Sequence, residues 1–131
     1  MRKLISGLIT IMVFALMLTG CGNFGPVNKT LTVTEVRWSE MGAGQPIVMT
    51  YTELEAGDVI YRGFSSVITI KSVTEDKLVL DIDGYLVEPN ADGSIDLRAD
   101  PLQSFTLKDG DTVEFVTQTM DAGENITITF E

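Results

Sequence analysis

From Thr30 to the end of the chain, apolar and polar side chains alternate along short segments. The clearest run is Ile126, Ile128 and Phe130, which are separated by threonines. A period of two residues is that of a strand with one buried face, whereas an amphipathic helix would repeat every 3.6 residues. This alternation therefore predicts that the chain beyond Thr30 folds from β-strands.

Glycine, proline, asparagine and aspartate divide this region into about 8–10 short strands. Many short strands at regular spacing favour an all-β fold, with an antiparallel β-sandwich as the first expectation and a β-barrel as the alternative. The predicted strands are residues 30–38, 47–51, 58–61, 64–74, 77–83, 85–87, 94–98, a segment starting at 105, 112–119 and 125–130.

Two local patterns refine this prediction. The alternation in residues 30–38 changes phase after Val33, which predicts a β-bulge near Thr34 or Glu35. The pair Asp83-Gly84 lies between two alternating runs and predicts a β-hairpin, because both residues of such a turn tolerate positive φ.

The aromatic side chains have two interpretations. Trp38, Tyr51, Tyr61, Phe64 and Tyr85 would suit a platform for a sugar or a peptide. Trp38 and Phe64 fall on apolar phases of their strands, so the sequence favours a place in the core for these two.

The residues that the chain lacks limit its chemistry. It contains no histidine and a single cysteine, Cys21. Nucleophilic triads that use histidine and zinc or copper sites that use histidine or cysteine are therefore excluded. A hydrolase built from carboxylates alone stays open, and Asp81 with Asp83 is a pair on one strand face, although aspartate beside a turn has an ordinary structural role. We expect a protein that is not an enzyme.

The first twenty residues have the composition of an export signal. Arg2 and Lys3 are followed by an apolar run of about 15 residues, shorter than the roughly 20 that span a membrane. We therefore expect residues 1–20 to form a signal helix that is removed.

The run ends in Leu18-Thr19-Gly20-Cys21. This tetrapeptide resembles the lipobox of bacterial prolipoproteins, which runs aliphatic, small, small, cysteine. The resemblance implies that a signal peptidase recognises Leu18, Thr19 and Gly20, and that Cys21 becomes the lipidated N-terminus. Two acyl chains on a thioether-linked diacylglycerol would hold the protein stably on the extracytoplasmic face of the cell membrane. Residues 21–29 would then be the tether and residues 30–131 the domain.

The excess of acidic over basic residues limits which partners this domain can bind. The leader contains two of the nine basic residues and none of the nineteen acidic ones, which leaves a formal charge of −12 on residues 21–131. Such a charge is repelled by phosphate backbones, so nucleic acid is not expected as a partner. It keeps an exported domain soluble, or it attracts a cationic peptide. The leading hypothesis is a binding module that sequesters such peptides, and the alternative is an accessory subunit of an envelope complex.

Two loops are candidate sites. Residues 88–99 match part of the EF-hand loop pattern. The candidate calcium ligands are Asn90, Asp92, Asp96 and Asp100, of which Asp100 lies one position after the end of the pattern. Glu88 and Ala99 depart from the pattern, which has Asp at the first position and Glu at the last. The other interpretation is a turn closed by glycine, and no other cofactor is expected.

The second loop, residues 39–46, contains Met41, Gly42 and Gly44. It is the predicted contact surface, because binding residues are often found on exposed loops.

Overall fold

The computed structural model describes residues 25–131, and within this range the chain forms ten strands and no helix. The signal helix, Leu18, Thr19, Gly20 and Cys21 lie outside the described residues. The strands are β1 (Leu31–Ser39), β2 (Gly42–Ala43), β3 (Ile47–Tyr51), β4 (Val59–Arg62), β5 (Ser66–Val73), β6 (Lys77–Gly84), β7 (Leu86–Val87), β8 (Ser104–Lys108), β9 (Thr112–Thr117) and β10 (Ala122–Phe130).

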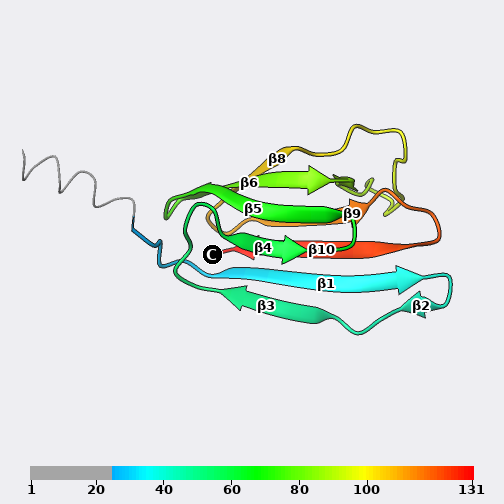
Figure 1. Ribbon diagram of the computed structural model, residues 1–131, viewed down its shortest axis with the longest axis horizontal. Coiled ribbons are helices and arrows are strands. Elements are labelled where there is room, and N and C mark those ends of the chain that lie inside the picture. The colour runs from blue at the N-terminus through cyan, green and yellow to red at the C-terminus, as the bar shows by residue number, and fades with distance from the viewer. Residues whose placement is uncertain (1–24) are drawn as a thin grey trace, which may run out of the picture.

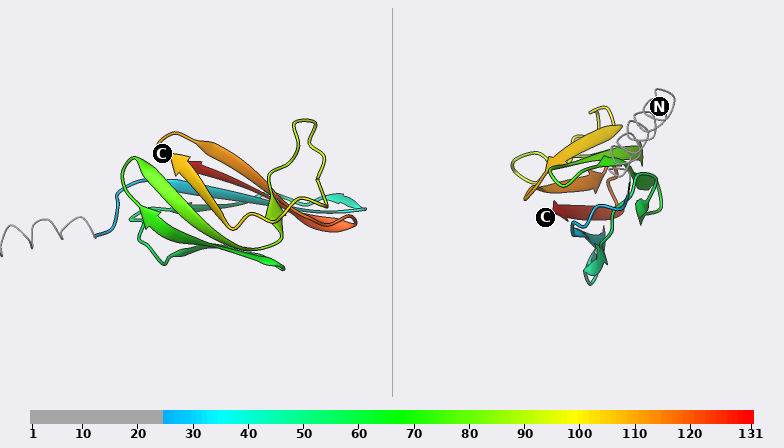
Figure 2. Two further views of the ribbon diagram at one scale, coloured as in Figure 1. Left: turned by 90° about the horizontal axis from the view of Figure 1, so that it is seen from above. Right: turned by 90° about the vertical axis from the view of Figure 1, so that its left-hand side faces the viewer.

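The strands form two antiparallel sheets that face each other as a sandwich (Figures 1 and 2). One sheet has six strands in the order β2-β1-β10-β9-β7, with β3 also paired to β1, and the other has four in the order β4-β5-β6-β8. The sheets do not close into a barrel. The predicted sandwich is therefore confirmed.

The core lies between the sheets and is built from the inward phase of each strand. Leu31 and Val33 on β1 face the interior beside Ile126, Ile128 and Phe130 on β10, and all five are fully buried. Phe105 on β8 meets Phe115 on β9 edge to face, with ring centroids 5.2 Å apart. Contacts of this kind between the two sheets hold them together by burying apolar surface.

The predicted bulge in β1 is wrong. All residues from Leu31 to Ser39 pair in continuous register with Phe130 to Ala122. The inward phase does not change after Val33 but continues to Glu35, which is buried. A charged residue at an inward position looks like a change of phase in the sequence.

The predicted hairpin at Asp83-Gly84 is also wrong. After Gly84 the chain leaves β6 and enters β7, which pairs with β9 in the opposite sheet. Gly84 has a φ of 128°, and a side chain there would overlap the carbonyl oxygen of Ser65. Glycine is therefore needed at this crossing for both its backbone conformation and the close approach of another segment.

Three further expectations about single segments differ from the structure. Residues 94–98 form no strand, because the loop between β7 and β8 is held by its own polar side chains. The predicted loop 39–46 contains the short strand β2, which pairs with the end of β1. Phe64 precedes β5 rather than belonging to it and is 87% exposed, so its predicted place in the core is wrong.

The first described residues are already part of the fold. Val27 and Leu54 exchange two backbone hydrogen bonds, each of 2.8 Å. Lys29 forms an ion pair of 2.6 Å with Asp109, and its ammonium group lies 5.5 Å from the centre of the Phe130 ring. The last residues of the predicted tether thus bind the end of the sandwich at which the chain enters (Figure 1).

Gly84→Ala should destabilise the fold more than Gly110→Ala. Both glycines have positive φ, so each substitution should cost about 1–2 kcal/mol. Gly110 faces open space, whereas the added carbon at Gly84 would meet backbone and should cost about 1–3 kcal/mol more. Urea denaturation of both variants measures the difference, and equal losses would contradict the role given to the crossing at Gly84.

Candidate functional site

A cavity of about 240 Å³ opens at the end of the sandwich opposite to Gly25. It lies where the end of β1, the start of β10 and the connection from β4 to β5 meet (Figure 1). We name it the Glu124 cavity, after one of its lining residues. Its lining residues are Arg37, Trp38, Phe64, Ser65, Thr117, Thr119, Ala122, Gly123 and Glu124.

The strand register places charged residues at the inner side of this end. Arg37 is the direct partner of Glu124 across the β1–β10 pair, and Glu35 lies one inward position earlier on β1. Glu35 and Glu124 are both buried, whereas most of the Arg37 side chain is exposed. Further along the same strands the inward positions are entirely apolar, so the polar part of the interior is confined to this end.

Arg37 neutralises Glu35. Its Nε donates a hydrogen bond of 2.8 Å to Glu35 Oε1, and its guanidinium carbon lies 5.1 Å from the centre of the Phe64 ring. The hydrogen bond and the charge of Glu35 raise the pKa of Arg37 above its ordinary value. Glu35 therefore has the cationic partner that a buried carboxylate needs.

Glu124 has no such partner. Its Oε1 accepts a long hydrogen bond of 3.4 Å from the Phe64 backbone N–H. Its Oε2 is buried and accepts no hydrogen bond from any residue in the range 25–131. Burial raises the pKa of Glu124, and the nearby charge of Glu35 adds to the effect, while Phe64 and Arg37 oppose it. The carboxylate form of Glu124 is thus only partly compensated.

Tyr61 carries a second uncompensated polar group beside Glu124. Its residue is 2% exposed, and its hydroxyl group finds no hydrogen-bond partner in the described part of the chain. A side chain at Gly63 would overlap both this hydroxyl and Glu124 Oε2, so the two atoms border the same small space. The absence of a side chain at Gly63 allows these two atoms to lie this close to its backbone.

Large apolar side chains are exposed at this end of the sandwich. Trp38 lies over Gly123, its partner on β10, and is half-buried rather than part of the core, so its predicted core position is also wrong. The connections at this end carry large exposed apolar side chains, with Met41 almost fully exposed. We name this set the distal rim, which consists of Met41, Phe64, Tyr85 and Met120.

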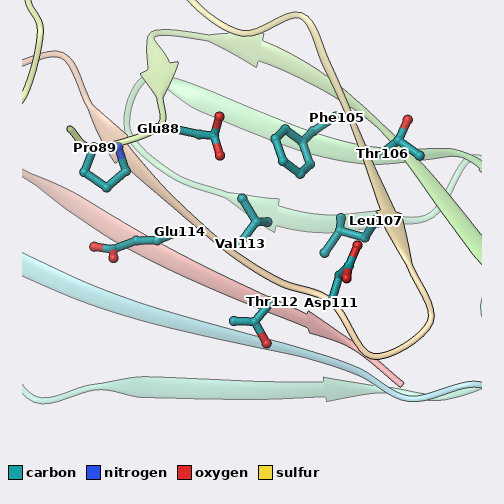
Figure 3. A pocket seen from close by; sticks show the side chains of 9 residues that line it. All are labelled: Glu88, Pro89, Phe105, Thr106, Leu107, Asp111, Thr112, Val113 and Glu114. Carbon is teal, nitrogen blue, oxygen red and sulfur yellow. The ribbon is translucent and has the colours of Figure 1, made fainter. Parts of the chain in front are cut away.

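A second hollow, of about 300 Å³, lies between β8 and β9 at an open side of the sandwich (Figure 3). Glu88 points into it toward Phe105, whereas Glu114 points away. Asp111 accepts a hydrogen bond from the Lys108 N–H, and Glu114 accepts one from Asn125. Because no buried polar atom in this hollow lacks a partner among residues 25–131, it is a weaker candidate than the Glu124 cavity.

The predicted calcium ligands mostly bind their own loop. Asp92 accepts hydrogen bonds from the backbone and hydroxyl of Ser94, and these bonds lower the pKa of Asp92. Asp96 accepts one from the Arg98 N–H, and the amide nitrogen of Asn90 donates to Ser94. Asp100 is exposed. Residues 25–131 contain no group of three or more acidic, histidine or cysteine side chains that could hold a metal ion.

The other predicted site residues lie at different distances from the Glu124 cavity. Met41, Gly42 and Gly44 are exposed and border a shallow hollow that shares Arg37 and Trp38 with it. Asp81 and Asp83 are exposed on β6 and line none of the hollows described above.

The central residues of the site, Glu35 and Glu124, were not predicted. Glu35 follows Leu31 and Val33 at intervals of two, and Glu124 precedes Ile126 and Ile128 in the same way. A charged residue in phase with the buried face of a strand is the signal that would have identified both.

No family model, curated protein or solved structure matches this chain. None of residues 25–131 belongs to a helix long and apolar enough to cross a membrane.

Glu124→Gln should become more stabilising, relative to the natural chain, as pH rises. A carboxyl group whose pKa is raised by folding supports the fold below its ordinary pKa, and this support is lost as pH rises through the raised value. Glutamine keeps the shape and does not titrate. Unfolding free energies between about pH 4 and pH 8 measure the difference, and a difference that does not grow with pH would contradict the assignment.

Proposed function

We propose that this protein is a lipid-anchored binding module, not an enzyme, that captures cationic peptides on the extracytoplasmic side of the membrane. The observation that carries the proposal is the distal rim, a set of exposed apolar side chains on the connections at the end of the sandwich where the Glu124 cavity opens. Exposed apolar side chains gathered at one place are typical of interaction sites on soluble domains.

The position of the distal rim suits an anchored protein. The chain enters the sandwich at the opposite end, and the lipobox-like motif ends at Cys21 (Figure 1). From Cys21 to Val27, which is fixed by its bridge to Leu54, an extended chain reaches at most about 20 Å. Lipid on Cys21 would thus hold the near end of the domain close to the membrane, and the distal rim would face outward.

Charge supports a cationic partner. A formal charge of −12 on residues 21–131 attracts basic peptides over distances longer than any single contact. At the distal end, Arg37 forms its ion pair with Glu35, so the charge of Glu124 has no ionic partner among the described residues. The same field repels nucleic acid.

A hydrolase based on two carboxylates is less well supported. Such enzymes place two acids on either side of the bond that is cleaved. Glu35 and Glu124 are close enough to influence each other, but only Glu124 lines the cavity, and Glu35 is bound to Arg37. Sustained turnover of glycan or peptide substrates by the purified chain would overturn the proposal of a binding module.

Replacing rim residues should weaken the binding of basic peptides. The double variant Phe64→Ser with Met120→Ser removes apolar contacts at the distal rim and leaves the net charge unchanged. Affinity of the full chain in detergent for a basic amphipathic peptide should fall about 10-fold or more, as for contacts near the centre of an interface. Val48→Ser is the control, because Val48 is exposed on β3, away from the rim. Equal losses in both variants would contradict a site at the distal rim.

The cellular consequence is independent of the site. If the protein sequesters cationic peptides, the growth of cells without it should be inhibited at lower peptide concentrations than the growth of cells that have it. Restoring the chain with Cys21→Ala should fail to protect cells, because this variant would lack the lipid. Unchanged sensitivity across a panel of such peptides would remove sequestration from the proposal.

A further inference from the structure

We propose that a second copy of this chain pairs with the free edge of β3, so that the six-stranded sheets of two molecules become continuous. The inference goes beyond the proposed function, because it concerns a different surface and requires neither a peptide nor the distal rim. Three observations carry it. The backbone of β3 is unpaired on one side, its residues carry no charge, and its sequence is complementary to itself in one antiparallel register.

β3 lies at the edge of the six-stranded sheet and pairs only with β1 (Figure 1). Thr30, directly before β1, and Glu131, directly after β10, exchange two backbone hydrogen bonds. Because backbone groups alternate in direction along a strand, the even-numbered residues of β1 bind β10 and the odd-numbered ones bind β3. The β1–β3 register pairs odd-numbered residues with each other. The N–H and C=O groups of Val48 and Thr50 therefore point away from the sheet, and no backbone group of residues 25–131 binds them.

The other free strand edges among residues 25–131 carry features that hinder pairing. The register of β4 shifts between Val59 and Tyr61. At the end of β8, the backbone N–H of Lys108 is already bound by Asp111. β7 has two residues, and the open part of β9 carries the exposed Glu114. Irregular register, charged side chains and short length are usual protections of an edge strand. β3 has none of them, since its five residues are uncharged and pair with β1 in continuous register.

The composition of β3 restricts the partner that fits its edge. Ile47 and Val48 are exposed, and no residue from Ile47 to Tyr51 is charged, in a domain with a formal charge of −12. A basic strand would find no carboxylate on β3 to pair with, and an acidic strand would be repelled by the domain as a whole. An uncharged strand with β-branched and aromatic side chains fits best. β3 of a second copy is such a strand.

One antiparallel register of β3 with itself pairs all five of its residues. With Met49 opposite the partner's Met49, Val48 exchanges two backbone hydrogen bonds with the partner's Thr50, and Thr50 does the same with the partner's Val48. Ile47 then lies opposite the partner's Tyr51. Pairs of β-branched and aromatic side chains across adjacent strands stabilise such a ladder.

Other registers are less favourable. A shift by one residue would place Val48 opposite a residue whose backbone groups already bind β1. A pairing centred on Val48 would include Pro46, which has no N–H to donate. A pairing centred on Thr50 would include Thr52, which lies outside β3. The register centred on Met49 therefore makes the most backbone hydrogen bonds.

This pairing is compatible with two chains anchored in one membrane. β3 pairs with Leu31–Glu35, the first part of β1, beside the place where the chain enters the sandwich. Antiparallel pairing there brings the near ends of both copies together and directs their distal rims apart. A contact of five residues on each side is small among protein interfaces, and confinement to a membrane raises the effective concentration of the two copies.

Disulfide trapping in membranes tests both the pairing and its register. Met49→Cys places two thiols at the centre of the pairing, where Cα atoms of a non-hydrogen-bonded antiparallel pair lie about 4.5 Å apart, within reach of a disulfide. In Ile47→Cys the two thiols would be about 14 Å apart, because they are separated by four residues along the strand. Membranes from cells with each full chain would be oxidised and analysed by nonreducing electrophoresis. The natural chain, whose only cysteine is Cys21, gives the background.

Met49→Cys should form a covalent dimer of two identical chains, and Ile47→Cys should remain at the background. Equal crosslinking of the two variants would overturn the inference, as would no crosslinking of either. A crosslink from Met49→Cys only to a different protein would overturn the assignment to a second copy. A melting curve of each variant verifies that it is folded.

Two substitutions of Thr50, each combined with Met49→Cys, test whether the backbone of this edge makes the contact. Thr50→Pro removes an N–H that points away from the sheet, so the pairing with β1 is retained while the edge is blocked. Thr50→Val keeps the N–H and the shape of the side chain. The yield of dimer should fall about 10-fold or more with proline and remain with valine. Equal yields would overturn the inference.

The result is separable from the proposed function. The rim variant Phe64→Ser with Met120→Ser, combined with Met49→Cys, should still form the dimer, and loss of the dimer there would overturn the placement of the interface on β3. Thr50→Pro should bind basic peptides as the natural chain does. If peptides bind and no dimer is trapped, the dimer is wrong and the binding module stands. If the dimer is trapped and no basic peptide binds, the dimer stands and the binding module is wrong.

Discussion

The antiparallel pairing of β1 with β10 is the contact on which the rest of the structure depends. These strands come from the two ends of the domain, and their continuous register joins Leu31–Ser39 to Phe130–Ala122. β3 and β2 are paired to one side of this ladder, and β9 is paired to the other. The same register closes the near end, where Thr30 and Glu131 exchange hydrogen bonds, and places Arg37 opposite Glu124 at the far end. One pairing thereby determines both where the chain enters and where its charged interior lies.

The interior changes character along this ladder. Its near part consists of aliphatic and aromatic side chains that bury their whole surface, and its far part contains the buried Glu35 and Glu124, with the partly exposed Arg37 at its edge. Apolar burial is favourable, whereas a buried carboxylate is tolerated only with a partner. Arg37 satisfies this need for Glu35 but not for Glu124. The domain thus combines an apolar core with a distal end where one buried carboxyl group has an ionic partner and the other does not.

The exposed apolar side chains lie near these polar groups because of topology. Met41, Phe64, Tyr85 and Met120 belong to four different connections, which antiparallel strands bring to one end of the sandwich (Figure 1). Phe64 links the two features, since its ring contacts Arg37 and its backbone N–H binds Glu124. Four hydrophobic residues spread over about eighty positions of the chain come to one end of the sandwich only when both sheets have formed.

The sequence by itself determined the fold class and most strand positions, because alternation with a period of two is a local property that each strand expresses independently. It also excluded histidine and thiol chemistry from the domain, because the residues are absent. Which strand pairs with which, and in which of the two sheets, was decided only by the tertiary structure. The turn chemistry of Asp83-Gly84 is the same whether the chain folds back or crosses to the opposite sheet, and hydrophobicity alone did not place Phe64 outside the core. The arrangement around Glu124 depends on contacts among β1, β4 and β10, which are far apart in the sequence. The sequence of each strand alone indicates only a charged residue at an inward position, and it does not indicate which strands come together.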